Sequence, residues 1–479
     1  MTHPRARWRR VRSLLLATSC AAAAAAGCSD ESGVPGGTVA PTGAGSTGGG
    51  GGGGTTTGAG GQGGEAGAAP APAPALYPSD RTHSPITAYV VDSLGDVLAR
   101  NPGSARDLFM KVGDSISASH AFLHCFAGSS VDLDAHGALQ PTLDLYRGTT
   151  ILGTTSFDRE SHVVEGGRTA SWAMSGTPSP LSQEMDALEP AVGVVMFGTN
   201  DIGWYGSDHL TTLDWYHGHM FGLVDAMLAR GILPILSTIP PRDDDADHDA
   251  WVPTFNATIR AFAQGRQIPL VDFHRELMLL SDHGLSADGV HPTASGSGAC
   301  VLTADGLDYG YNLRNLITLE ALDRVQRAVL DGGGALEDEA PTLSGQGTRS
   351  DPFVVTGRPF VDVRDTSGAA SDELDTYDGC SSTADESGPE VVYRLDVSTP
   401  VRIRAVVLDR GDVDVDVHLL DDSATSAGCL DRNDALVEAD LSTGTYHLVL
   451  DTYVSSGTER SGEYTFLLLI CEPGDPACG

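Results

Sequence analysis

The stretch "LFMKVGDSIS" (residues 108–117) joins an apolar run to a turn that presents a serine. An apolar run without alternation is typical of a strand that is buried on both faces of a parallel sheet. Ser115 then follows the carboxyl end of the strand, where open α/β sheets hold their chemistry. Gly-Asp-Ser is also a common turn composition, so a nucleophilic serine requires a base, an orienting carboxylate and oxyanion donors elsewhere in the chain.

The same pattern of short apolar runs and longer amphipathic segments extends over residues 77–331. The apolar runs lie at 108–112, 162–164, 192–197, 232–239 and 268–273, and the helix-like segments at 213–231, 252–265 and 313–333. This alternation predicts an α/β domain with a parallel sheet and helices on both of its faces. Residues 332–351 read as a linker. Residues 352–479 contain short alternating segments between turns, which is typical of an all-β sandwich.

Polar motifs follow the strand ends of the predicted sheet. "GTND" (198–201) follows one apolar run directly, and "DGVHPT" (288–293) follows the last run after a short helix. His291 could deprotonate Ser115 while Asp288 holds the imidazole in the right tautomer. The Asn200 side chain and the backbone N–H of Ser115 could bind an oxyanion, with a third donor from the turn after "HVVEGG". Each motif alone could be a plain turn, but their shared placement favours a hydrolytic site.

The chain has no Gly-x-Ser-x-Gly, which excludes the nucleophile elbow of α/β-hydrolases. "VGDSIS", "FGTNDI" and "DGVHPT" instead resemble blocks I, III and V of the SGNH (GDSL-type) hydrolases. The resemblance implies a flavodoxin-like three-layer α/β/α fold that cleaves esters. It also implies a Ser115–His291–Asp288 triad with Asn200 as an oxyanion donor. Block II fits "EGGRTASW" at Gly167, and Gly176 in "MSGTPS" is the alternative.

Residues 352–479 resemble bacterial pre-peptidase C-terminal domains, which are β-sandwich (jelly-roll-like) modules. The segments that carry this resemblance are "GPEVVYRLDV", "VDVDVHLL" and "GTYHLVLDTY". No second catalytic set is evident there. The acidic residues of this domain could hold calcium or simply form a solvated face.

The first 27 residues predict a signal peptide, with a basic start and a short apolar run. It ends in "AAGC", which resembles a bacterial lipobox and implies that Cys28 is lipidated; an ordinary signal peptide is the alternative. Residues 28–76 are rich in Gly, Ala and Pro and predict a flexible tether. Together these features predict a lipid-anchored protein of the cell envelope, and Ser29 favours the outer membrane.

The formal net charge is −35, and loss of residues 1–27, with five arginines and no acid, takes it to −35 − 5 = −40. This charge argues against nucleic acid and against contact with anionic membranes other than through the anchor. After Cys20 and Cys28, six cysteines remain, an even number that predicts disulfides. Separate folding of the two domains favours the pairs Cys125–Cys300, Cys380–Cys429 and Cys471–Cys478.

Several further side chains leave alternatives open. "HGH" (217–219) could bind a metal or pack, and "DDDADHD" (243–249) could bind a cation or be a solvated loop. Trp172, Trp204 and Tyr205 could stack on a sugar or an acyl group, or only pack. No Cys-x-x-Cys spacing occurs, so we expect neither a metal nor a cofactor.

The sequence therefore predicts a serine ester hydrolase that acts on a small-molecule or polysaccharide ester such as an acylated carbohydrate or lipid. One alternative is an envelope carbohydrate-binding or adhesion lipoprotein with a degenerate SGNH domain. The other is an SGNH O-acyltransferase, which sequence does not separate from a hydrolase. The oligomeric state is left open, with a monomer as the expectation.

Overall fold

The computed structural model describes residues 73–471 and residue 478. The expected signal peptide, Cys28 and most of the expected tether lie outside these residues. All of the described residues belong to one compact unit. In the part of the chain that is described, no helix has the length and apolar character needed to cross a membrane.

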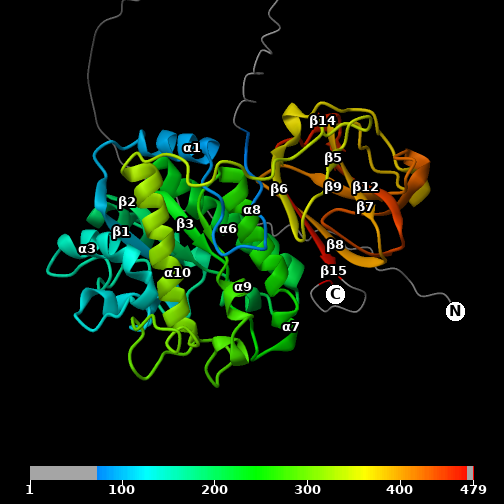
Figure 1. Ribbon diagram of the computed structural model, residues 1–479. Helices are drawn as coiled ribbons and strands as arrows, with labels where there is room; N and C mark the ends of the chain where they lie inside the picture. Colours follow the sequence, from blue (N-terminus) through cyan, green and yellow to red (C-terminus); the bar gives the residue numbers. More distant parts are fainter. Residues whose placement is uncertain (1–72, 472–477, 479) are drawn as a thin grey trace, which may run out of the picture. The chain divides into compact units, whose positions relative to one another are not determined.

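A parallel sheet forms the centre of the first region, which confirms the predicted fold class (Figure 1). Its strand order is β1-β2-β3-β4. The strands are β1 (Ala105–Gly113), β2 (Pro190–Met196), β3 (Leu233–Ser237) and β4 (Leu270–Val271). Every residue of β2 is buried, because helices cover both faces of the sheet, and this explains the uninterrupted apolar run in the sequence.

The expected strand at 162–164 does not form. Val164 makes only an isolated parallel bridge to Gly113, on the side of β1 opposite β2. Ser161 competes with strand formation, since its hydroxyl donates to Lys111 O at 2.7 Å and accepts from Val163 N at 3.3 Å. With this bridge counted as a reduced strand, the order follows the 2-1-3-4-5 pattern of flavodoxin-like sheets.

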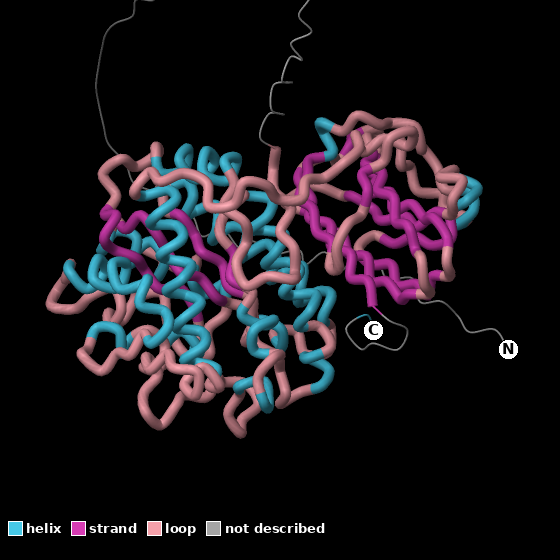
Figure 2. Tube along the Cα trace, viewed as in Figure 1, coloured by secondary structure: helices cyan, strands magenta, loops and turns pink. Residues whose placement is uncertain are grey.

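Helices cover both faces of this sheet (Figures 1 and 2). The longer ones are α1 (Ala88–Leu98), α3 (Gln140–Gly148), α5 (Pro180–Leu188), α6 (His209–Ala229), α8 (Val252–Arg266) and α10 (Gly310–Val325). The short ones are α2 (Ser115–Ala118), α4 (Ala170–Ala173), α7 (Ala246–Asp249) and α9 (Phe273–Leu277). Contacts group α1, α3 and α10 together, and α4, α5, α6 and α8 together, which gives the three layers of the α/β/α prediction.

The second region is a sandwich of two sheets, as the alternating segments predict (Figure 2). One sheet has the order β10-β9-β12-β7-β5 and the other β11-β8-β15-β6. Its strands are β5 (Phe353–Val354), β6 (Phe360–Asp365), β7 (Glu390–Val397), β8 (Val401–Asp409), β9 (Val415–Leu420), β10 (Cys429–Asn433), β11 (Leu436–Leu441), β12 (Gly444–Thr452) and β15 (Glu463–Cys471). A hairpin of β13 (Val454–Ser455) and β14 (Thr458–Glu459) stands beside them.

Strand β15 is buried on both faces. Tyr464, Phe466 and Leu468 belong to the core of the sandwich, whereas Leu467 and Leu469 belong to the core cluster of the α/β region. Helix α8 packs on β6 and β15. This double burial explains why the segment "FLLLI" loses the alternation of its neighbours.

Polar contacts also join α6 and α8 to β15. His217 Nε2 lies 2.9 Å from Thr465 Oγ1, and Arg266 forms an ion pair with Glu463 at 2.6 Å. Burial lowers the pKa of His217 to about 3, so this ring is neutral. His217 of the "HGH" segment therefore has a packing role at this contact.

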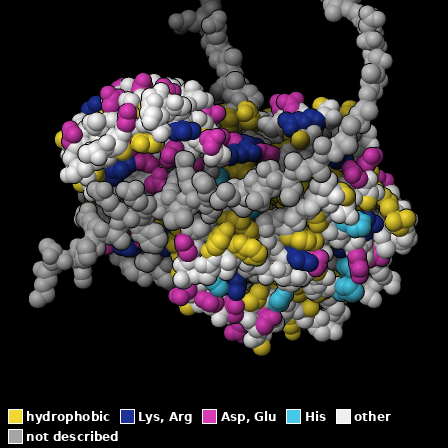
Figure 3. Space-filling view, turned by 180° about the vertical axis from the view of Figure 1, so that it is seen from behind, with side chains coloured by type: hydrophobic (Ala, Val, Ile, Leu, Met, Phe, Trp, Pro, Cys, Tyr) yellow, Lys and Arg dark blue, Asp and Glu magenta, His cyan; other side chains and the backbone are white. Residues whose placement is uncertain are grey.

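The expected linker is held against the α/β region. Leu336 N donates to Ile86 O at 2.9 Å, and Pro341 O accepts from Leu76 N at 2.7 Å. Ala75, which the sequence assigns to the tether, is buried. Acidic side chains are spread over the face seen in Figure 3, with Lys and Arg among them.

Candidate active site

The turn after β1 positions Ser115. A Cβ at Gly113 would lie 2.7 Å from Met196 O, so only glycine allows β1 to approach β2 this closely. Asp114 then caps the short helix α2, with its Oδ1 accepting from Ile116 N at 3.0 Å. The half-buried Ser115 is the first residue of that helix, at the carboxyl end of the strand.

A continuous hydrogen-bonded relay joins the three side chains of the predicted triad. Ser115 Oγ lies 2.9 Å from His291 Nε2, and His291 Nδ1 lies 2.7 Å from Asp288 Oδ2. If His291 Nδ1 carries the proton, as a bond to a carboxylate requires, then Nε2 is the acceptor for the serine hydroxyl. This geometry can deprotonate Ser115 during attack.

The backbone of the loop holds Asp288 in place and ionised. Its Oδ1 accepts from the N–H groups of Val290 and His291, each at 3.0 Å, and from Ser286 Oγ at 2.8 Å. Slight burial works to raise the pKa of Asp288, but these hydrogen bonds outweigh it and hold the pKa far below its ordinary value. The carboxylate can therefore stabilise an imidazolium across the working pH range.

Asn200 lies at the end of β2, with its amide directed at the same turn. Its Nδ2 donates to Arg168 O at 3.0 Å and to Asp114 Oδ2 at 3.3 Å. Both N–H bonds are thus engaged without substrate. An oxyanion must replace one of these partners, and the longer bond to Asp114 is the easier to replace.

The loop that follows the Val164 bridge lies against the serine. A Cβ at Gly166 would lie 3.7 Å from Ser115 Cβ, and Gly167 is exposed with a φ of +75°. Gly176 lies after helix α4, further along the chain than the loop that contacts Ser115. The backbone near Gly167 is therefore the better placed of the two sequence candidates, and its role as a donor stays a prediction.

This site coincides with a family match. Residues 112–299 match the model of the GDSL-like lipase/acylhydrolase family. The chain carries a GDSL-like acylhydrolase domain. The match begins inside β1 and ends just beyond His291, so it includes Ser115, Asn200, Asp288 and His291.

Solved structures resemble both regions of the chain. A GDSL-like lipase from Bacteroides thetaiotaomicron is 18% identical, with 48% of this chain and 98% of that chain covered and a TM-score of 0.29. A catalytic mutant of an acetylxylan esterase from Geobacillus stearothermophilus is 16% identical, with 46% and 95% covered and a TM-score of 0.31. The pre-peptidase C-terminal domain of a collagenase from Bacillus anthracis is 12% identical, with 24% and 91% covered and a TM-score of 0.17. No curated protein matches the sequence significantly.

Two buried carboxyl groups lie beneath the catalytic turn of the acylhydrolase domain. Burial raises the pKa of Asp114 to about 6, against the hydrogen bond from Ile116 N. Burial also raises the pKa of Asp201 to about 7, against the hydrogen bond from Ala170 N, and the nearby charge of Asp114 raises it further. Asp201 Oδ2 is buried and has no hydrogen-bond partner among the described residues.

Helix α10 fixes the catalytic turn from below. Arg314 is buried, and it donates to Ile116 O at 2.8 Å and to Ser117 Oγ at 2.9 Å. Its guanidinium also lies over the ring of Phe122, 3.7 Å from the centroid. Arg314 thus anchors the segment that carries Ser115. Its two hydrogen bonds go to residues next to Ser115 and not to the triad itself.

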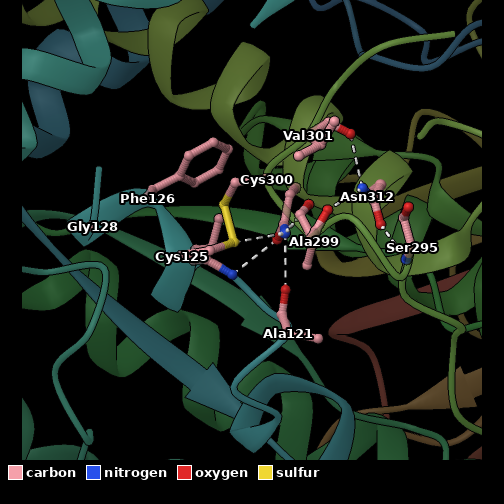
Figure 4. The surroundings of a disulfide bond; sticks show 12 residues. Ala121, Cys125, Phe126, Gly128, Ser295, Ala299, Cys300, Val301 and Asn312 are labelled. Atoms are coloured by element: carbon pink, nitrogen blue, oxygen red, sulfur yellow. Dashed lines mark hydrogen bonds between the residues drawn. A yellow bond between two sulfur atoms is a disulfide. The ribbon is translucent and has the colours of Figure 1, made fainter. Parts of the chain in front are cut away.

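The same helix anchors the loop that follows His291 (Figure 4). Asn312 accepts from Ser295 N at 3.1 Å and donates to Gly298 O and Val301 O, each at 2.9 Å. Asn315 donates to Ala299 O at 3.0 Å. These amides bond to the backbone of an irregular loop that is partly exposed, and so fix its course.

A disulfide bond between Cys125 and Cys300 ties this loop to the segment after Ser115 (Figure 4). Its Cα atoms are 5.7 Å apart. The structure also contains the Cys380–Cys429 and Cys471–Cys478 bonds, so all three pairs are those favoured by the sequence.

Two groups of described side chains in the sandwich each bring three possible metal ligands together. The first group is Glu386, Asp416 and His418, and the second is Asp414, Asp416 and Asp434. Arg432 Nη2 donates to Glu386 Oε1 at 2.8 Å and also bonds Asp416. The guanidinium therefore already supplies a positive charge to the first group. Both groups lie outside the acylhydrolase domain.

Proposed function

We propose that the protein is a serine ester hydrolase that acts through Ser115, His291 and Asp288 on a carboxylic ester such as an acylated carbohydrate or lipid. The observation that carries this proposal is the relay of 2.9 Å and 2.7 Å hydrogen bonds from serine to imidazole to carboxylate. It has the connectivity of serine hydrolases in general.

In the first half of the proposed reaction, Ser115 Oγ attacks the ester carbonyl carbon and its proton passes to His291 Nε2. The carbonyl oxygen becomes an oxyanion, which Ser115 N–H and Asn200 Nδ2 bind, with the Gly167 backbone as a further donor. The bond between the carbonyl carbon and the alcohol oxygen then breaks, and His291 returns the proton to the leaving alcohol. This leaves an acyl group on Ser115.

In the second half, water attacks the acyl carbon and its proton passes to His291 Nε2. The bond between the acyl carbon and Ser115 Oγ then breaks, and His291 returns the proton to Oγ, which releases the acid. The side chain of His291 is 39% exposed, which gives water a path to this base. The same opening admits an alcohol, which would take the acyl group in a transfer reaction. Measurement of free acid against transacylated product in the presence of an added sugar alcohol separates the two reactions.

The test of the triad is covalent labelling with a fluorophosphonate probe. We expect the probe to label Ser115 in the wild type and not in Ser115→Ala, while the exposed control Ser130→Ala is labelled normally. Ser115→Ala should also abolish hydrolysis of p-nitrophenyl acetate. A folded Ser115→Ala protein with wild-type activity would refute the proposal and leave the binding-protein alternative.

We also propose that the chain is held at the bacterial cell envelope by lipid on Cys28. The support for this is the "AAGC" sequence after the apolar run and the tether composition that follows it.

A further inference from the structure

Three aromatic side chains form an exposed surface one turn away from Asn200. They are Trp204, Tyr205 and Trp215, called the aromatic platform below. Trp204 is 53% exposed and Tyr205 is 48% exposed. Exposed apolar side chains that gather into one contiguous patch, unlike single exposed ones, indicate a binding surface.

The platform is held rigidly. The ring of Trp204 stacks on that of Trp215, with 4.9 Å between centroids and 5° between planes, and Tyr205 meets Trp215 edge to face at 6.1 Å. The backbone N–H of Trp204 donates to Asp201 O at 2.9 Å, which holds the backbone of Trp204 in the turn after Asn200. Trp215 covers one face of the Trp204 indole, while Trp204 as a whole is still 53% exposed. A flat ligand meets a ring held in this way with little loss of side-chain entropy.

The platform borders the catalytic loop through the acidic loop 243–249. A Cβ at Gly203 would lie 3.2 Å from His248 Cε1, which places this loop beside the platform. A Cβ at Gly289, next to the catalytic carboxylate, would lie 2.6 Å from Asp244 N, which places the same loop beside the triad. Loop 243–249 therefore lies beside both the platform and the loop that carries Asp288.

We infer that the aromatic platform is a subsite for a neutral sugar ring, and that the natural substrate is an acylated oligosaccharide. This inference rests on the ester-hydrolase function proposed above. The C–H face of a pyranose ring matches one flat indole face, while its hydroxyl groups remain in water or bond to polar neighbours.

The surroundings of the platform favour a sugar over a lipid. The carboxylates of loop 243–249 and a net charge of −35 repel anionic headgroups, and they offer acceptors to hydroxyl groups. A saturated acyl chain gains most where apolar walls surround it, whereas Trp204 offers one half-exposed ring. The platform therefore fits the alcohol portion of a saccharide ester better than a fatty acyl chain.

The test compares kcat/KM of the full chain on three esters: a neutral acetylated xylo-oligosaccharide, p-nitrophenyl acetate and p-nitrophenyl decanoate. We expect Trp204→Ala to lower kcat/KM for the oligosaccharide at least tenfold more than for p-nitrophenyl acetate, mainly through KM. Trp204→Phe should recover part of the loss. The control is Leu430→Ala, since Leu430 is also 53% exposed but lies in the sandwich.

Calorimetric binding of the same oligosaccharide to the Ser115→Ala variant gives a readout apart from catalysis. Binding should weaken at least tenfold when Trp204→Ala is added. Equal losses on the oligosaccharide and on p-nitrophenyl acetate would overturn the inference, and so would a loss specific to the decanoate. A wild type that cleaves p-nitrophenyl acetate but no saccharide ester would overturn the sugar subsite and leave the esterase proposal standing. A wild type that cleaves no ester would overturn both.

Discussion

The buried carboxyl of Asp201 makes a testable contribution to the pH dependence of stability. The group is fully buried, and its pKa is raised from 3.8 to about 7, first by burial and then by the charge of Asp114. A raised pKa means that the folded state holds the proton over a pH range in which the unfolded chain has lost it. Stability from this group is therefore complete below pH 3.8 and is lost as the pH rises through about 7.

The size of the effect follows from these values. Each tenfold change in proton affinity corresponds to about 1.4 kcal/mol, so the ionised Asp201 costs the folded state about 4 kcal/mol above pH 7. At pH 5 the cost is only about 1.6 kcal/mol, because the folded state still holds its proton. Asp201→Asn removes the charge at every pH. The free energy of unfolding of the variant relative to wild type should therefore rise by about 2–3 kcal/mol between pH 5 and pH 8.

Urea unfolding followed by tryptophan fluorescence measures this difference. Apart from Trp8, all tryptophans lie between Trp172 and Trp251, so the signal reports on the α/β region. Any loss of stability that the new amide causes equally at both pH values cancels when the difference in free energy of unfolding at pH 5 is subtracted from that at pH 8. Asp80→Asn, at a side chain that is 79% exposed, controls for the loss of one negative charge. A relative stability of Asp201→Asn that stays the same or falls toward pH 8 would refute the reasoning.

Three further outcomes are expected. Asn200→Ala should lower kcat for p-nitrophenyl acetate by about 10²–10³, as for the loss of one oxyanion donor, and an unchanged kcat would remove Asn200 from the site. Replacement of Cys125 and Cys300 by serine should lower the free energy of unfolding by up to about 5 kcal/mol, because the bond closes a loop with a sequence separation of 175; peptide mapping that finds free thiols in the wild type would contradict this. Cys28→Ser should move the protein from the membrane fraction to the soluble fraction, whereas a wild type that is already soluble would count against the anchor.

The sheet could be predicted from the sequence because its strands are buried on both faces. β2 carries seven residues that are all buried, and no polar residue interrupts the run. The same reasoning was wrong at 162–164, where three residues cannot maintain a strand against the local hydrogen bonds of Ser161. Short runs beside serine and glycine are therefore the weakest evidence for a strand.

The reactive side chains of the site could also be predicted. Ser115, Asn200 and His291 follow strand ends, and the parallel arrangement brings such ends to one edge of the sheet. The residues that support them could not be predicted. Arg314 bonds to the backbone oxygen of Ile116, 198 residues away, and Asn312 to those of Gly298 and Val301; only their polar character within a buried helix hints at such a role.

The doubly buried strand β15 also constrains how the protein is made. This strand spans residues 463–471, so it leaves the ribosome after β6, β8 and every residue of the catalytic relay. Its neighbours β8 and β6 leave the ribosome earlier and have no middle strand between them until it arrives. Leu467 and Leu469 also complete the cluster that includes α8, so the α/β region carries an open apolar surface during synthesis. A nascent chain stalled shortly before residue 463 should therefore bind chaperones and be cleaved by proteases, although every residue of the catalytic relay has already been made.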